Sequence, residues 1–333
     1  MKAFVIKNRY DLAIVIINFQ TPELTINCLK SLRTEVQHLN ACVVLVDNNS
    51  GDGSIEKIEQ DIETLGFGEQ LAVYRSPING GFSAGNNLGI KAVQADYYLL
   101  TNSDTLIRKD ALNILLATAK NNHKIGLLAP RLEWPDGAPQ ESCFKYHTPL
   151  SELIGSAKTG FITKLFKNKV VPQPVSDTSK NYDWVSFASV LVNAKVFENI
   201  ELMDEGYFMY FEDVEFCHRA KQSGWEIMYE PSAHVVHLRG GSSPLKAQAK
   251  LRKRLPRYFY ESRTRYFFQI YGRTGLLLAN LLWTLGWIIS SLRMKVSASY
   301  TSDTSEKQWR DIWINVLNPE KPYTHPDDYG NKA

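Results

Sequence analysis

Short apolar runs alternate with amphipathic segments through the first 130 residues of the chain. The runs are rich in β-branched residues and end in polar clusters, which is typical of strands buried in a parallel sheet. They cover residues 12–18, 42–47, 71–75, 97–104 and 125–130. Between them, apolar residues recur at helical spacing, as in the segment that Pro22 opens. Strands alternating with helices predict an α/β fold with a doubly wound, mostly parallel sheet.

The pattern weakens between residues 134 and 183, where prolines interrupt it repeatedly. We interpret this stretch as a long, mobile insertion. Strands are predicted again at 184–193 and 225–229. Between these two strands, the acidic pair Glu212-Asp213 opens an amphipathic segment. The positive end of a helix dipole there favours the ionised form of both carboxylates.

The C-terminal region has a different character, so we divide the chain into a domain of residues 1–243 and a helical appendage of residues 244–333. A basic, aromatic-rich helix is predicted over 245–271, followed by the uncharged stretch 274–292. That stretch is long enough to span a membrane, but Trp283 and Trp287 lie at its centre and not at its ends. We favour a helix that packs on the protein or lies in a membrane interface, with a purely structural hairpin as the alternative. The tail has an apolar face that either docks back or pairs with a second copy in a homodimer.

Composition narrows the class of protein. The chain has 333 residues, of which 44% are hydrophobic, so it can bury a large core. Its four cysteines are scattered, which indicates neither a disulfide framework nor a zinc ribbon and favours a reducing cytosol. No signal peptide is recognised in the first residues, where the apolar run is too short.

Charge is distributed unevenly along the chain. The net charge is +3, yet residues 246–295 carry eleven Lys or Arg against one acid, giving +10 and leaving −7 for the remainder. A basic block beside an apolar segment predicts an anionic membrane surface as a partner. No nucleic-acid reading motif is recognisable, so we expect no nucleic acid partner.

Polar residues at strand ends are the candidates for chemistry, because open α/β sheets bind ligands at the carboxyl edge. Asp47 ends the second run, and Asn102-Ser103-Asp104 ends the fourth. The glycine-rich loop NGGFSAGNN enters a helix, which suits a phosphate or a sugar ring. Its spacing matches neither a Walker A loop nor a Rossmann fingerprint.

Six polar clusters stand in a recognisable order, namely NFQTPEL, VDNNSGDGS, NGGFSAGNN, TNSDT, YFMYFEDVEFCHR and HVVHLRGGSS. Together they resemble the family 2 glycosyltransferases with the GT-A fold, most closely the rhamnosyltransferase-like and galactofuranosyltransferase-like members. The resemblance covers residues 12–243. It implies an inverting enzyme that moves a sugar, with L-rhamnose favoured, from a dTDP or UDP donor to a hydroxyl of a lipid-linked glycan or oligosaccharide. Such an enzyme would act in bacterial polysaccharide synthesis, in the cytoplasm at the inner face of the cytoplasmic membrane.

The resemblance also implies which residues bind the donor. Asn18 and Phe19 fall where the family contacts the nucleobase, although Gln20 replaces the more usual Asn. Asp47 would accept from a pyrimidine N–H, and its alternative is an ordinary turn residue. The glycine-rich loop would contribute Gly81, Gly85 and Asn86.

A metal site is implied by the match of Asn102-Ser103-Asp104 to the family's DXD motif, which holds Mg²⁺ or Mn²⁺ against the diphosphate. An Asn in the first position can coordinate a cation or hydrogen-bond a ribose, but it adds no charge. Asp104 then needs a second ligand, for which His237 is the candidate. A core histidine is the alternative for His237, and His234 is interpreted as structural.

Catalysis is assigned to the acidic pair. The resemblance makes Asp213 the general base for the acceptor hydroxyl and leaves Glu212 to orient the acceptor or assist. A helix-capping pair is the local alternative. An inactive nucleotide-sugar-binding protein, a galactofuranosyltransferase and an N-acetylhexosaminyltransferase remain the competing functions, whereas a nucleotidyltransferase is disfavoured because its basic glycine-rich loop is absent.

Overall fold

The computed structural model describes residues 9–240, 245–297 and 299–330 and separates into two compact units. The first unit comprises the described residues of Met1–Cys143, Pro174–Glu205 and Phe216–Ser242. The second comprises those of Phe144–Gln173, Gly206–Glu215 and Ser243–Ala333. The predicted domain boundary after residue 243 lies outside the described residues. Two internal segments belong to the same unit as the C-terminal region.

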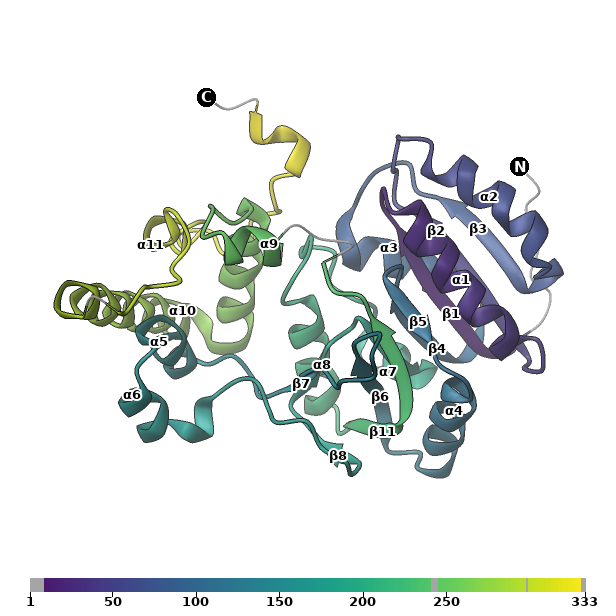
Figure 1. Ribbon diagram of the computed structural model, residues 1–333, viewed down its shortest axis with the longest axis horizontal. Helices are drawn as coiled ribbons and strands as arrows, with labels where there is room; N and C mark the ends of the chain where they lie inside the picture. Colours follow the sequence, from purple (N-terminus) through teal and green to yellow (C-terminus); the bar gives the residue numbers. More distant parts are fainter. Residues whose placement is uncertain (1–8, 241–244, 298, 331–333) are drawn as a thin grey trace. The chain divides into compact units, whose positions relative to one another are not determined.

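A nine-stranded sheet forms the centre of the first unit (Figure 1). Its order is β3-β2-β1-β4-β10-β6-β11-β5, with β8 beside β11. The strands are β1 (Tyr10–Asn18), β2 (Ala41–Asp47), β3 (Leu71–Arg75), β4 (Ala95–Asn102), β5 (Thr105–Ile107), β6 (Ile125–Glu133), β8 (Lys180–Asn181), β10 (Ser189–Asn193) and β11 (Glu226–His237). Strands β3, β2, β1 and β4 are mutually parallel, as are β6 and β11, while β10, β5 and β8 pair antiparallel. The predicted α/β class with a mostly parallel sheet is therefore confirmed.

Helices cover both faces of this sheet because side chains alternate along each strand. Leu12, Ile14 and Ile16 share a buried cluster with residues of α1 (Pro22–Val36), α2 (Ser54–Leu65) and α4 (Ala111–Asn121). Figure 1 shows α1 and α2 lying side by side. The opposite face of β1 meets α3 (Gly81–Lys91) so closely that a Cβ on Gly89 would lie 2.4 Å from a methyl carbon of Val15. The first unit also contains α7 (Ala194–Ile200), β9 (Trp184–Val185) and the 3-10 helix η1 (Gly68–Gln70). Two elements are divided between the units, namely β7 (Cys143–Phe144) and α8 (Glu212–Gln222), whose residues up to Glu215 belong to the second unit.

The second unit is mainly helical among its described residues. It contains α5 (Pro149–Ala157), α6 (Gly160–Leu165), α9 (Leu245–Lys250), α10 (Arg257–Val296), α11 (Gln308–Asp311) and the 3-10 helices η2 (Lys167–Lys169) and η3 (Pro326–Gly330). The predicted helix over 245–271 is wrong in one respect, because it stops at Lys250 and restarts at Arg257. Pro256 explains the break, since a proline disfavours helical geometry in the residue before it. Helix α10 also turns at Gly272, whose φ of 67° and ψ of −173° are not helical.

The region 134–183 is more regular than the sequence analysis predicts, because it contains α5 and α6. Pro149 occupies the first turn of α5, where a proline is favoured and does not break the helix. Thr148 caps this helix: Ser151 N donates to Thr148 Oγ1 at 3.1 Å, and Thr148 N donates to Ser151 Oγ at 2.8 Å. The prolines on which the prediction of an irregular insertion rests therefore include one, Pro149, that begins a helix.

Helices α5 and α10 pack closely around Gly286. A Cβ on this glycine would lie 2.1 Å from Ser156 Oγ and 2.8 Å from both Leu153 O and Ala157 N. The last two atoms belong to the α5 backbone and cannot rotate away. Gly286 is therefore required for the close approach of the two helices.

Replacing Gly286 with Ala is expected to lower the free energy of unfolding by about 1–3 kcal/mol, because the methyl group must push the α5 backbone outward. Urea unfolding followed by circular dichroism measures the change. Gly155→Ala on α5 is the matched control, since a Cβ there meets no atom within 4 Å. That control should be neutral or stabilising by about 0.5–1 kcal/mol. Equal effects for the two substitutions would contradict the packing argument.

Candidate active site

Asp47 ends β2 in a buried hydrogen-bond network. Its Oδ1 accepts from Asn18 Nδ2 at 2.8 Å and from Ser50 Oγ at 2.6 Å, and its Oδ2 accepts from Ser50 N at 3.2 Å. A carboxylate offers about four lone-pair directions, so one on Oδ2 is left for a ligand N–H. Asp47 therefore stabilises the turn after β2, and it keeps one lone pair that could accept a hydrogen bond from the base of a nucleotide sugar.

Asn18 is fully buried, and the protein uses its whole side-chain amide. Besides the bond to Asp47, Nδ2 donates to Ser50 Oγ at 3.0 Å, and Oδ1 accepts from Thr25 Oγ1 at 2.9 Å. Asn18 therefore fixes the Asp47 carboxylate in place, and its predicted contact with a base stays a prediction. Phe19, which follows it, is 38% exposed, so part of its side chain is accessible to a ligand.

The sequence analysis missed Ser50 and Asn48, both of which organise this edge of the sheet. Gln20 donates to Ser50 through its backbone N, at 3.0 Å from Oγ, and through Nε2, at 3.0 Å from the carbonyl. Asn48 Nδ2 donates to Asn79 Oδ1 at 2.9 Å and to Gly81 O at 3.0 Å. Asn48 Oδ1 is buried and accepts no hydrogen bond from the described residues. Both residues lie in the DNNS turn, whose polar density was the available signal.

The glycine-rich loop begins α3, and its residues take different tasks. Gly81 has a φ of 80°, which favours glycine, and its N donates to Asn79 Oδ1 at 3.1 Å. A Cβ on Gly85 would lie 3.0 Å from Ile17 Cδ1, so this glycine serves the packing of α3 on β1. Asn86 Nδ2 donates to the Phe82 carbonyl at 3.0 Å within the helix. The predicted ligand roles of Gly81, Gly85 and Asn86 remain predictions beside these structural roles.

Asn87, one residue further along α3, was not predicted as important. It is buried, its Nδ2 donates to Met203 O at 2.8 Å and to Glu205 Oε1 at 2.9 Å, and its Oδ1 accepts from Met203 N at 3.1 Å. This side chain holds the loop that precedes Gly206. Nothing in the sequence distinguishes Asn87 from Asn86, because their roles differ only in tertiary contacts.

Asn102-Ser103-Asp104 forms the tight turn between β4 and β5. Ser103 Oγ lies 3.0 Å from Thr21 Oγ1, which connects this turn to the loop after β1. Asp104 is buried, and its backbone carbonyl accepts from Leu238 N at 2.9 Å. The polar clusters that follow β1, β2 and β4 therefore meet at one edge of the sheet.

His237 lies beside Asp104, as the metal prediction requires. In the antiparallel pair of β11 with β5, His237 is opposite Thr105, and its Nε2 lies 3.6 Å from Asp104 Oδ1. A carboxylate oxygen and an imidazole nitrogen at this separation suit one Mn²⁺ or Mg²⁺ ion. The described residues contain no cluster of three or more His, Cys, Asp or Glu side chains that could hold a metal. The diphosphate oxygens of a donor would have to supply further ligands.

His234 has the structural role that the sequence analysis assigned to it. Its Nδ1 lies 3.0 Å from Glu133 Oε2, and Arg108 Nε donates to Glu133 Oε1 at 2.9 Å. Glu133 is buried, so these partners compensate its charge. His234 and His237 belong to separate groups of side chains.

The acidic pair belongs to the second unit and begins α8. It is preceded by Tyr210 and Phe211, whose φ values are 73° and 67°. Two successive non-glycine residues in the left-handed region cost about 1–3 kcal/mol each and persist only where the surroundings enforce them. Such strain is concentrated at functional sites.

Aromatic residues of α10 enforce this strained turn. Phe211 contacts Tyr266 and Phe259 at centroid distances of 5.3 Å and 5.7 Å, and the Tyr210 ring stacks on Tyr258 at 6.3 Å. Hydrogen bonds fix the chain just before the turn, because Ser262 Oγ donates to Met209 O at 3.1 Å and Tyr207 Oη donates to Gln269 Oε1 at 2.5 Å. The C-terminal region therefore shapes the segment that presents the acidic pair.

Glu212 and Asp213 differ in their environments. Burial raises the pKa of Glu212 well above its usual value of 4.5, and the neighbouring Asp213 carboxylate raises that pKa further. Glu212 Oε2 accepts no hydrogen bond from the described residues. Asp213 is only partly buried. A carboxyl group held in its protonated form can donate a hydrogen bond, so the raised pKa of Glu212 gives the two adjacent acids different chemistry.

Glu212→Gln is expected to flatten the pH dependence of stability. Above pH 4.5 the unfolded chain releases this proton while the folded chain retains it, so stability falls as pH rises through the interval up to the raised pKa. The loss is about 1.4 kcal/mol per pH unit within that interval. Urea unfolding between pH 5 and pH 8 should show this decline in the original protein and lose it in Glu212→Gln. A Glu56→Gln control, at an exposed site, should keep it.

Comparisons with known proteins indicate the class to which this protein is similar. Residues 13–142 match the family described as Glycosyl transferase family 2. An N-acetylglucosaminyl-diphospho-decaprenol L-rhamnosyltransferase from Mycobacterium tuberculosis is 27% identical over 256 residues, which cover 73% of this chain and 79% of that protein. A low-salt glycan biosynthesis hexosyltransferase from Haloferax volcanii is 26% identical over 231 residues, covering 68% and 67%.

Among solved structures, GalNAc-T7 with UDP, GalNAc and Mn²⁺ superposes with a TM-score of 0.56 at 13% identity. The match covers 88% of this chain and 59% of that one, so the chain spans little more than half of the GalNAc-T7 structure. At this identity the likeness establishes the fold. The predicted family resemblance and the predicted enzyme class are confirmed: residues 13–142 match family 2 of the glycosyltransferases, the fold is the GT-A fold, and the chain is similar to L-rhamnosyltransferases.

Proposed function

We propose that this glycosyltransferase moves a sugar from a nucleoside-diphosphate donor to an acceptor hydroxyl, with inversion and with Asp213 as general base. The observation that carries the proposal is the acidic pair itself, which begins a helix directly after a strained turn. Burial raises the pKa of Glu212 and favours its protonated form, whereas Asp213 beside it is only partly buried. A capping pair alone would need neither the strain nor the buried acid.

In the proposed reaction, the Asp213 carboxylate accepts the proton of the acceptor hydroxyl. The hydroxyl oxygen attacks the anomeric carbon while the bond from that carbon to the diphosphate oxygen breaks on the opposite face, which inverts the configuration. Glu212, as a neutral acid, can donate a hydrogen bond that orients the acceptor. Asp104 and His237 would hold Mg²⁺ or Mn²⁺, and that ion, when bound, neutralises charge on the departing diphosphate.

For the donor we propose dTDP-L-rhamnose, and for the acceptor a lipid-linked glycan. The name of the Mycobacterium tuberculosis relative, with its diphospho-decaprenol acceptor and L-rhamnosyl group, supports both. Asp47, with an oxygen lone pair left for a base N–H, and the partly exposed Phe19 side chain support a pyrimidine nucleotide. UDP with a galactofuranosyl or N-acetylhexosaminyl group is the alternative donor.

A second candidate function is binding of a nucleotide sugar without transfer. The observation that favours it is Asn102, which removes one negative charge from the metal motif. Under that function Asp104 and His237 would lack the charge to bind a divalent ion tightly. The two functions therefore differ in metal dependence and in turnover.

A panel of nucleotide sugars distinguishes these functions. Calorimetry with UDP and dTDP, with and without Mn²⁺, is paired with an assay of donor hydrolysis. We expect dTDP to bind more tightly with Mn²⁺, His237→Ala to lose most of that gain, and dTDP-L-rhamnose to be hydrolysed. Metal-insensitive binding without hydrolysis of any donor would overturn the proposed transfer in favour of the binding function.

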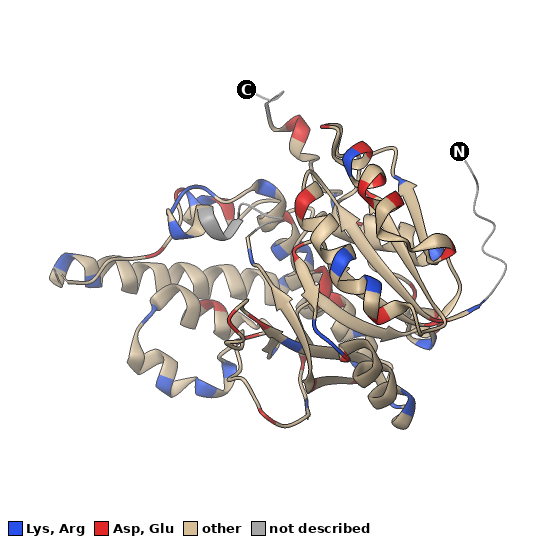
Figure 2. Cartoon of the chain, turned by 45° about the vertical axis from the view of Figure 1, so that its right-hand side comes forward, with Lys and Arg blue, Asp and Glu red and all other residues tan. Residues whose placement is uncertain are grey.

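Membrane association is a further part of the proposal. By length and composition, α10 could cross a membrane, and 33% of its most apolar window is buried. The exposed part is a stripe of Leu277, Leu281, Leu285, Ile288 and Leu292 at helical spacing. Residues 274–292 carry no charge, and Figure 2 shows α10 uncharged along this stretch until the basic residues at its end, Arg293 and Lys295. An apolar stripe with basic neighbours suits binding to an anionic lipid surface, and we propose the inner face of the cytoplasmic membrane as that surface.

The double substitution of Leu281 and Leu285 by Asp is expected to reduce vesicle binding more than tenfold, because each leucine contributes about 1.5–3 kcal/mol when it leaves water. Sedimentation with phosphatidylglycerol vesicles measures binding, and vesicles of phosphatidylcholine alone test the charge requirement. Ile78→Asp, at an exposed apolar site in the first unit, is the control. Unchanged binding of the double variant would contradict the interfacial role.

A further inference from the structure

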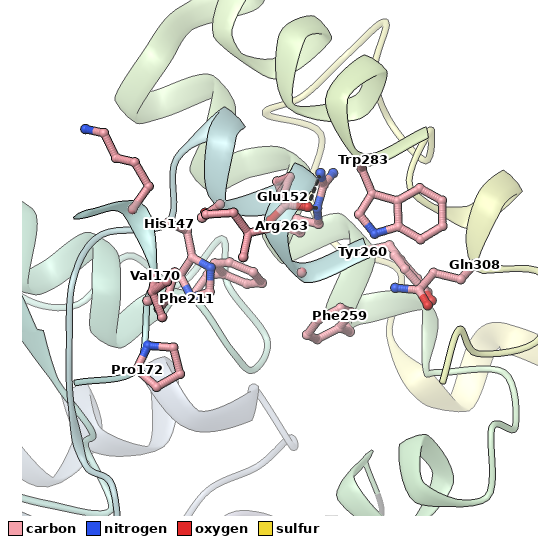
Figure 3. Close-up of a pocket in the computed structure, with 15 residues that line it drawn as sticks. His147, Glu152, Val170, Pro172, Phe211, Phe259, Tyr260, Arg263, Trp283 and Gln308 are labelled. Atoms are coloured by element: carbon pink, nitrogen blue, oxygen red, sulfur yellow. Dashed lines mark hydrogen bonds and ion pairs between the residues drawn. The ribbon is translucent and has the colours of Figure 1, made fainter. Parts of the chain in front are cut away.

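A cavity of about 330 Å³ lies within the second unit. Figure 3 shows the side chains around it, which come from the segment 144–173, from Phe211 and from the C-terminal helices. Its volume is at the lower end of the range of about 300–1,000 Å³ that is usual for small-molecule sites. None of the residues that line this cavity falls in the family match at residues 13–142 or among the predicted site residues.

One boundary of the cavity is the ion pair between Arg263 and Glu152, in which Arg263 contacts only one of the two carboxylate oxygens. Arg263 donates to Glu152 Oε2 from Nε at 3.0 Å and from Nη2 at 2.7 Å, and its Nη1 donates to Asn280 Oδ1 at 2.7 Å. Glu152 Oε1 accepts no hydrogen bond from the described residues, and the Glu152 side chain is 12% exposed. The guanidinium charge is therefore already compensated, while one carboxylate oxygen can accept from a ligand hydroxyl.

The other polar lining groups are uncharged or peripheral. Burial lowers the pKa of His147 to about 4, so its imidazole is neutral at pH 7. Gln308 adds an amide, and Lys169 is exposed. With Arg263 engaged, the described lining residues offer no interior cation for a diphosphate. An anionic ligand is therefore disfavoured here.

Aromatic and aliphatic side chains complete the lining. Phe211, Phe259 and Trp283 contribute rings, and Val170 and Pro172 lie near His147 (Figure 3). Flat apolar surfaces together with a carboxylate and neutral hydrogen-bonding groups match a sugar ring, which has apolar C–H faces and a rim of hydroxyls. A prenyl chain would take the carboxylate out of water and give it no hydrogen bond in return.

We propose that this cavity binds a sugar ring of the acceptor. The inference rests on the proposed transfer function, because Phe211 lines the cavity and immediately precedes Glu212 and Asp213. The backbone that carries the proposed base is thus continuous with one wall of the cavity. A ring held there has its hydroxyls presented to the segment that would deprotonate one of them.

Gly155 permits a direct test, because it lines the cavity and a Cβ there meets no atom within 4 Å. Gly155→Phe is expected to fill the space without strain in α5. Gly160→Phe is the matched control, since Gly160 also has open space but is not among the lining residues. Glu152→Gln is the second variant, and it removes the charged acceptor while keeping an amide oxygen for Arg263.

Binding is measured by saturation-transfer NMR with methyl glycosides of N-acetylglucosamine, glucose, galactose and L-rhamnose. We expect at least one glycoside to bind the original protein and Gly160→Phe. Its affinity should fall at least tenfold in Gly155→Phe and about 10- to 100-fold in Glu152→Gln, as for loss of a hydrogen bond to a charged group. Binding of none of the glycosides, or equal binding by Gly155→Phe and Gly160→Phe, would overturn the inference.

Calorimetric binding of dTDP and hydrolysis of dTDP-L-rhamnose in the same variants separate this inference from the proposed function. Both should be unchanged in Gly155→Phe, which also reports that the first unit is folded. If nucleotide binding and donor hydrolysis are normal but no glycoside binds, the cavity assignment alone fails. If a glycoside binds as expected but no donor is bound or hydrolysed, the transfer function fails and the sugar site stands.

Discussion

Asp213→Asn is expected to reduce sugar transfer by about 10²- to 10⁴-fold, the usual contribution of a positioned general base. The amide keeps the size of the side chain but cannot accept the hydroxyl proton. Asp213 is partly buried at the start of α8, where Val214 N lies 2.9 Å from its Oδ1, and an Asn Oδ1 can accept that same bond. The measurement is product formation with a saturating donor, with folding checked by thermal melting.

Two controls sharpen that result. Nucleotide binding by Asp213→Asn should match that of the original protein, because the proposed donor residues Asp47 and Asp104 belong to the first unit. Asp303→Asn, at an exposed acid of the second unit, should retain full activity. Near-normal transfer by Asp213→Asn would remove this residue from catalysis and leave the pair as a helix cap.

Arg263→Leu is expected to lower the free energy of unfolding by about 3–5 kcal/mol, the effect of removing one partner of a buried ion pair. Arg263 is 4% exposed and links α5, through Glu152, to the second half of α10, through Asn280. Its loss leaves the Glu152 charge largely buried without a cation. Urea unfolding of the full chain measures the difference.

The double variant Arg263→Leu with Glu152→Leu should recover a large part of that loss, because no unpaired charge remains. Asp303→Ala, which breaks the exposed pair with Lys158, should cost less than about 1 kcal/mol. A loss for Arg263→Leu no larger than that of Asp303→Ala would show that the buried pair is not needed to hold the helices together.

Local pattern is sufficient to predict the parallel strands of the sheet and the edge at which the proposed donor residues lie. Strands β1, β2 and β4 are apolar runs that end in polar residues, and parallel strands bring those ends to one edge. Asp47 and Asp104 could therefore be selected from the sequence alone. His237 was a candidate metal ligand only through the family resemblance, because its proximity to Asp104 depends on the pairing of β11 with β5, which no local pattern predicts.

Features that depend on contacts between distant segments could not be predicted in this way. The left-handed geometry of Tyr210 and Phe211 is unfavourable for both residues and exists because rings on α10 enforce it. The start of α5 was not predicted, because a proline can either interrupt regular structure or occupy the first turn of a helix. The sequence around Pro149 does not distinguish these two situations. The pairing of Glu152 with Arg263 joins positions 111 residues apart, and neither residue stands in a recognisable motif.

Gly272 divides α10 into two halves with different tasks, and this has a practical consequence for preparing the protein. The half before the kink contacts the turn at Tyr210 and Phe211, whereas the half after it carries the exposed leucine stripe. Cutting the chain before Arg257 to improve solubility would remove both. Polar substitutions confined to the stripe keep the first half intact, so they offer a route to a detergent-free enzyme that still has its acidic pair in place.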